Sequence, residues 1–124
     1  CLPILADLYQ KANRTTGTLR YIEMRNLGDI SLFLSGFFSD YVKNTICGMN
    51  YYIDMGSAAY IDASRHNSDS HKLMLELSKK FYIIVDILQC VSDATMKMQS
   101  QIETRQAFDD CRKKELIRSD LFFN

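Results

Sequence analysis

Two aspartates inside apolar stretches are the residues best placed to do chemistry in this sequence. Asp86 lies within the otherwise apolar residues 83–88, and Asp29 follows Gly28 inside another apolar run. A buried, ionised carboxylate needs a partner or has a raised pKa. Such a group can act as a general base or anchor a ligand in a core pocket. It can equally form a structural bond to a tyrosine hydroxyl, an arginine or a free backbone N–H, and the sequence leaves both interpretations open.

Metal ligands are a second possibility. Asp29, Asp54 and Asp86 fall on three different predicted helices. Metal sites in helical bundles use Glu ligands with Glu-x-x-His pairs, and the sequence contains no Glu-x-x-His. His66, Asp69 and His71 share one polar segment, but their spacing matches no established metal motif. We therefore expect no metal site and no cofactor, and we expect a solvated loop at residues 65–70.

A third possible site is an aromatic pocket, suggested by the cluster Tyr51, Tyr52 and Tyr60. At helical spacing such residues are most often core, with their hydroxyls at the rim. They can also line a pocket for an apolar or aromatic ligand, and they are enriched at protein interfaces. A small-molecule pocket, if present, is expected between the helices predicted over 18–38, after Asn50 and over 69–96. Its ligand-binding residues would be Asp29, Tyr51, Tyr52, Tyr60 and Asp86.

Catalytic nucleophiles and nucleotide-binding loops are missing. No serine lies in a G-x-S-x-G motif, and no glycine-rich loop follows a strand. The basic run Arg112, Lys113, Lys114 and Arg118 is typical of the solvated end of a helix. Fifteen basic side chains balance fifteen acidic ones, whereas nucleic acids and anionic membranes attract a basic excess. We expect no catalytic residue and no nucleic-acid partner, and keep transcriptional regulation as the third functional alternative.

Helices must position all these residues. A chain of 124 residues that is 47% hydrophobic can bury one real core, which excludes a disordered protein. Strand alternation and hairpin turns are missing. Apolar spacing predicts helices over 2–12, 18–38, from Asn50 towards residue 64, 69–96 and 100–117, with an ambiguous segment at 39–48. The sequence thus predicts an all-α, single-domain bundle of four to five helices around the apolar helix over 69–96.

Three glycines lie inside the predicted helices. Gly28, Gly36 and Gly56 each weaken a helix by about 1 kcal/mol relative to alanine. A glycine at such a position often allows another backbone to come close. We expect close helix packing at all three.

The cysteines are scattered singly, at positions 1, 47, 90 and 111, without CxxC spacing. This pattern favours reduced thiols in a cytoplasmic protein, with Cys90 buried in its apolar run. No secretory signal is present, and the longest apolar stretch, residues 81–91, is too short to span a bilayer. A mature bacterial lipoprotein begins with cysteine and continues with a polar tether, whereas Cys1 is followed by apolar residues at helical spacing. We therefore expect residues 1–124 to be a fragment or ordered part of a longer chain.

Two segments carry a family resemblance. LGDISLFLSGFF over 27–38, followed by YYIDMGSAAY over 51–60, resembles a family of uncharacterised bacterial proteins that pairs an LGD…LF…GFF segment with a YY…MG…AY segment. The similarity spans residues 27 to about 91. It implies a bacterial, cytoplasmic, helical protein and no mechanism, because the family has no established activity. It draws attention to Gly28, Asp29, Gly36, Tyr51, Tyr52, Gly56 and Tyr60.

The functional expectation follows from what is present and what is missing. Aromatic and apolar residues are in surplus, no catalytic constellation is found, and the C-terminal tail, residues 121–123, is apolar. We therefore predict a non-enzymatic module that works by protein–protein contact, as a homodimer or with another protein. A small-molecule-binding or minor enzymatic domain is the alternative.

Overall fold

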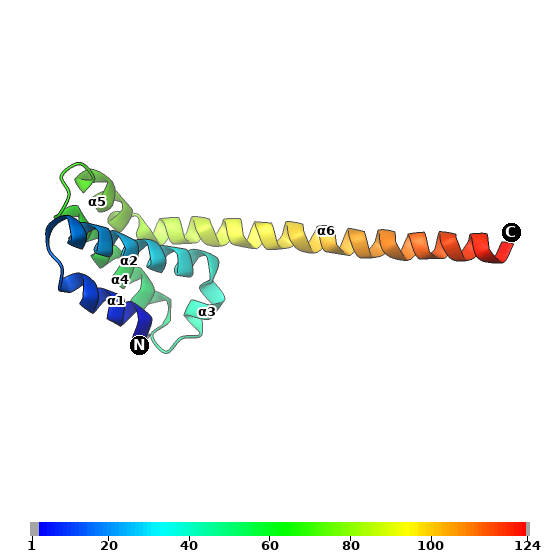
Figure 1. The fold of residues 1–124 in the computed structure, drawn as a ribbon, viewed down its shortest axis with the longest axis horizontal. Coiled ribbons are helices and arrows are strands. Elements are labelled where there is room, and N and C mark those ends of the chain that lie inside the picture. Colours follow the sequence, from blue (N-terminus) through cyan, green and yellow to red (C-terminus); the bar gives the residue numbers. More distant parts are fainter. Residues whose placement is uncertain (1–2, 124) are drawn as a thin grey trace. The chain divides into compact units, whose positions relative to one another are not determined.

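The computed structural model describes the backbone of residues 3–123 and the side chains of residues 5–115 (Figure 1). This part of the chain forms helices and turns without any strand, which confirms the all-α class. The helices are α1 (Pro3–Asn13), α2 (Gly17–Phe37), α3 (Ser39–Lys43), α4 (Gly48–Ser64), α5 (His71–Lys79) and α6 (Phe81–Phe123). Gly17 and Gly48 open α2 and α4 with φ angles of 61° and 72°, which residues with a side chain rarely adopt.

The chain separates into two units, Cys1–Cys90 and Val91–Asn124. The first, here called the compact unit, contains α1 to α5 and the first ten residues of α6. The second, here called the distal segment, is the rest of α6. The expectation of one domain over 1–124 stays a prediction.

The centre of the compact unit is the packing of α2 against α4. Each helix buries one face at helical spacing, with Met24, Leu27 and Ser31 on α2 and Tyr52, Ala59 and Tyr60 on α4. The remaining helices pack around this pair: α1 contacts α2, α3 contacts both, and α5 contacts α4. Apolar spacing therefore identified both helices, although neither was expected to be central.

The apolar helix expected over 69–96 is two helices in the structure. α5 ends at Lys79, Lys80 forms a turn, and α6 begins at Phe81. The break allows Met74 of α5 to pack into the core while Phe81 and Val85 of α6 are buried separately. The helices predicted over 69–96 and 100–117 also imply a break near residues 97–99. The structure has no break there, because α6 continues to Phe123 without an interrupting glycine or proline.

Each of the three helix glycines lies directly against a side chain of another helix. A Cβ atom at Gly28 would be 2.5 Å from Cε1 of Tyr60, and one at Gly36 would be 2.5 Å from Cβ of Leu88. At Gly56 it would overlap the ring of Phe81. These three close approaches join α2 to α4, α2 to α6 and α4 to α6.

Candidate functional site

Asp29 and Tyr60 are brought together across the α2–α4 interface. The Tyr60 hydroxyl donates a hydrogen bond of 2.6 Å to Oδ1 of Asp29. Asp29 is exposed, whereas the tyrosine is buried, with its ring over Gly28 and 5.8 Å from the ring of Phe81. Burial first, and then the bond to Asp29, raise the pKa of the Tyr60 hydroxyl. The phenol is thus held as a proton donor to Asp29, a pairing suited to joining two helices rather than to proton transfer.

Two of the other three residues of the expected α2–α4–α6 pocket, Asp86 and Tyr52, make no hydrogen bond to this pair. Asp86 is exposed on α6, so the burial that its apolar neighbours over 83–88 suggested is not found. α6 buries only the side that carries Phe81 and Val85, and its apolar neighbours Ile83 and Ile87 are themselves exposed. Tyr52 is fully buried, its hydroxyl has no hydrogen-bond partner among residues 5–115, and burial raises its pKa.

Tyr51 lines a different hollow from the one expected. This groove, of about 370 Å³, lies between α1 and α4. Its lining residues are Tyr9, Tyr51, Asp54, Met55 and Ala58. The four residues from α4 share one side of that helix, and Tyr9 comes from α1. The groove is therefore aromatic and carries one carboxylate.

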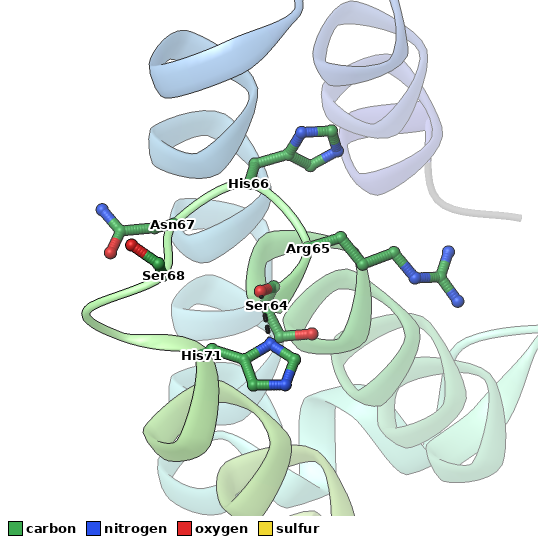
Figure 2. A pocket seen from close by; sticks show the side chains of 6 residues that line it. All are labelled: Ser64, Arg65, His66, Asn67, Ser68 and His71. Carbon is green, nitrogen blue, oxygen red and sulfur yellow. Dashed lines mark hydrogen bonds between the residues drawn. The ribbon is translucent and has the colours of Figure 1, made fainter.

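The histidine segment forms a wide, open hollow of about 800 Å³ (Figure 2). Figure 2 shows its side chains diverging, with Arg65 pointing away from Asn67 and Ser68. His71 is engaged through Nδ1 with the carbonyl oxygen of Ser64 at 2.8 Å. Over the described residues, no three His, Cys, Asp or Glu side chains gather in a way that could hold a metal ion. The hollow thus offers scattered polar groups and no converging ligand set.

A two-bond ion pair between α2 and α4 joins residues that the sequence did not single out. Arg20 of α2 binds Asp62 of α4 through two hydrogen bonds, Nε to Oδ1 at 2.9 Å and Nη2 to Oδ2 at 2.8 Å. Nη2 of Arg20 also donates to Asn13 at the end of α1, at 3.1 Å. Both partners of the ion pair are about four-fifths buried. Forty-two positions separate them, so no local spacing could have revealed the pair.

This ion pair makes an acid-sensitive contribution to stability. The hydrogen bond from Arg20 holds the pKa of Asp62 below its usual range. Because the folded-state pKa is the lower one, the stabilisation is complete above the unfolded value of about 4 and is lost as pH falls through the folded value. In urea titrations, Arg20→Gln is expected to lower the free energy of unfolding by about 1–3 kcal/mol at neutral pH. The difference should shrink below pH of about 4, and an undiminished difference there would contradict the pairing.

In the distal segment, Ser92 is partly buried and the other described side chains are exposed. Every side chain from residue 93 to residue 115 is exposed. Val91, Met98 and Ile102 are 49%, 64% and 54% exposed, and with Ala94 they follow at intervals of three or four residues. They therefore share one side of the helix. Arg112, Lys113 and Lys114 are exposed too, whereas the side chains of Arg118 and of the apolar tail 121–123 lie outside the described part.

The thiols differ from expectation at two positions. Cys47 is disulfide-bonded, so the prediction of reduced cysteines is wrong for this residue. Cys90 is a free thiol and is exposed rather than buried, because its part of α6 is covered on one side only. Cys111 is free and exposed as well.

Among the described helices, none combines the length and apolar character needed to cross a bilayer. The resemblance of residues 27–38 and 51–60 to a bacterial family stays an expectation. No protein-family model, curated protein sequence or solved structure matches this chain.

Proposed function

We propose that this protein is a non-enzymatic interaction module that pairs with a second copy of itself through the distal segment. The observation that carries the proposal is the exposed apolar side of α6, formed by Val91, Ala94, Met98 and Ile102 and here called the apolar stripe. A helix in water is stabilised only weakly by its own side-chain pairs, at about 0.2–0.5 kcal/mol each. Most helices in proteins depend instead on packing of an apolar face.

Side-by-side pairing of two copies would bury this stripe twice. Full burial of a side chain such as Val, Ile or Met is worth about 1.5–3 kcal/mol. Because the stripe residues are already half buried, pairing of two copies gains about 6 kcal/mol or more of burial free energy. This gain is comparable with the lower part of the range of free energies that association costs. Exposed neighbouring side chains enlarge the contact, so a dimer of moderate affinity is expected.

The charges beyond the stripe favour a second copy over an unrelated partner. Arg105, Asp109 and Arg112 continue along the same side of the helix and are exposed. Their signs alternate along that side, so a second copy displaced by one helical turn would place opposite charges against each other. An unrelated partner would need a matching pattern of its own.

Oligomeric state in solution tests this proposal. Sedimentation velocity of the full chain over a range of concentrations should show a monomer–dimer equilibrium. Met98→Glu combined with Ile102→Glu should weaken the dimer at least about 100-fold, because it places four carboxylates in the contact. The matched control is Ser100→Glu with Thr104→Glu, which adds the same charge at the same spacing on the opposite side of the helix.

Two results would contradict the proposal. A strictly monomeric protein at high concentration would remove it altogether. Equal dissociation by both double variants would show that general repulsion, rather than the apolar stripe, controls the association. The control variant also guards against loss of helix, which circular dichroism would report for either protein.

The source of the protein is proposed from the resemblance of residues 27–38 and 51–60 to a family of bacterial proteins. It supports a bacterial source, which we include in the proposal. Cytoplasmic localisation depends on the expectation of reduced thiols, and the disulfide at Cys47 removes part of that support. Transcriptional regulation has one supporting feature, the exposed basic residues Arg112, Lys113 and Lys114. Salt-sensitive binding to duplex DNA would be required to sustain it.

A further inference from the structure

The groove between α1 and α4 contains a carboxylate that the fold itself does not use. Asp54 is exposed at its rim and has no hydrogen bond or ion pair with any residue in the described part of the chain. Asp62 and Asp29, by contrast, are engaged by Arg20 and Tyr60. Asp54 thus leaves a negative charge uncompensated beside a hollow of about 370 Å³.

The walls of the groove suit a particular class of charge. Tyr9 and Tyr51 provide aromatic surface, and Met55 adds a polarizable thioether. Aromatic faces attract cations through their quadrupole, and an alkylated cation is poorly hydrated, so that it gives up little hydration when it packs on a ring. Arg20 interacts electrostatically with Tyr9, but its guanidinium is bound to Asp62 through two atoms and makes no ion pair with Asp54.

We propose that this groove binds a small organic cation of the alkylammonium class. The positive nitrogen lies against the carboxylate of Asp54, and its alkyl groups pack on the rings of Tyr9 and Tyr51. The volume is at the lower end of the range for ligand pockets, about 300–1,000 Å³. The site therefore fits a molecule with few non-hydrogen atoms, whose affinity is limited accordingly.

Choline is a suitable probe because an uncharged molecule of nearly the same shape, 3,3-dimethylbutan-1-ol, serves as its neutral control. Titration of the full chain with each, followed by amide chemical shifts, should give saturable changes at the groove residues with choline only. We expect a dissociation constant in the range of about 0.1–10 mM at low salt. Asp54→Asn should weaken choline binding about tenfold or more, whereas Asp40→Asn, the same change at an exposed site on α3, should not alter it.

Three outcomes would overturn the inference. Choline could cause no saturable change up to about 50 mM, about fivefold above the weakest affinity expected. The neutral alcohol could bind equally well, which would make the groove a simple apolar surface. Asp54→Asn and Asp40→Asn could weaken binding to the same extent, which would reduce the effect to net charge. None of these results bears on the dimer proposed through α6, because the groove lies within the compact unit.

Discussion

Replacing Phe81 by alanine is expected to lower the free energy of unfolding by about 3–5 kcal/mol. Its ring is 1% exposed, fills the space left by the missing side chain of Gly56, and contacts the ring of Tyr60. Truncation would remove the link between α6 and α4 and leave a cavity in the centre of the compact unit. Urea denaturation at one fixed protein concentration measures the loss, because self-association would otherwise add a concentration-dependent term.

A second substitution shows whether the loss comes from the contact seen in the structure. In the natural chain, Gly56→Ala should be destabilising, because its new Cβ overlaps the Phe81 ring. In the Phe81→Ala background the same change should cost clearly less, because only the contact with Cβ of Ser31, at 2.9 Å, remains and alanine is favoured over glycine in helices by about 1 kcal/mol. The two backgrounds together form a double-mutant cycle. If Gly56→Ala changed the free energy of unfolding equally in both backgrounds, that result would contradict the contact between Gly56 and the Phe81 ring.

Tyr82→Ala is the matched control for the Phe81 prediction. Tyr82 is the next residue of α6 and is 58% exposed. Its replacement should cost less than about 1 kcal/mol, because surface substitutions rarely remove more. A loss comparable with that of Phe81→Ala would mean that α6 is covered on a second side.

The spacing of apolar residues was sufficient to predict most helices. It placed α1 and α2 within a residue or two of their ends and identified α4 from its tyrosines and small residues. It failed at Lys80, where no glycine or proline interrupts the apolar pattern. Directly after the break, Phe81 packs against Gly56, which is a tertiary contact that local spacing does not contain.

The candidate site was predictable only in part, for a similar reason. Apolar neighbours suggested that Asp86 is buried, but periodicity does not reveal how many sides of a helix are covered. For Asp29 the structure shows one of the bonds considered from the sequence, that to a tyrosine hydroxyl. The groove beside Asp54 is formed by the placement of α1 against α4. The spacing of apolar residues predicts each helix but does not reveal how the two helices are placed.

Removal of the Tyr60 hydroxyl should also destabilise the compact unit, because it breaks the hydrogen bond to Asp29. Tyr60→Phe keeps the buried ring but loses the 2.6 Å bond to Asp29, and we expect a loss of about 1–2 kcal/mol near pH 8. The value is below that of a fully buried charged hydrogen bond, because Asp29 is exposed and water can replace the hydroxyl. Asp29→Ala should cost a similar amount, and combining the two changes should cost little more than either.

Alkaline pH separates this hydrogen bond from simple packing. The folded-state pKa of Tyr60 is raised above the unfolded value, first by burial and then by Asp29. Its stabilisation is therefore complete below about pH 10 and is lost as pH rises beyond that value, because the unfolded chain releases the proton first. The advantage of the natural chain over Tyr60→Phe should narrow by about 1.4 kcal/mol per pH unit above that point. A difference that stays constant with pH would show that the phenol is not held protonated, and Tyr82→Phe, which removes an exposed hydroxyl, provides the comparison.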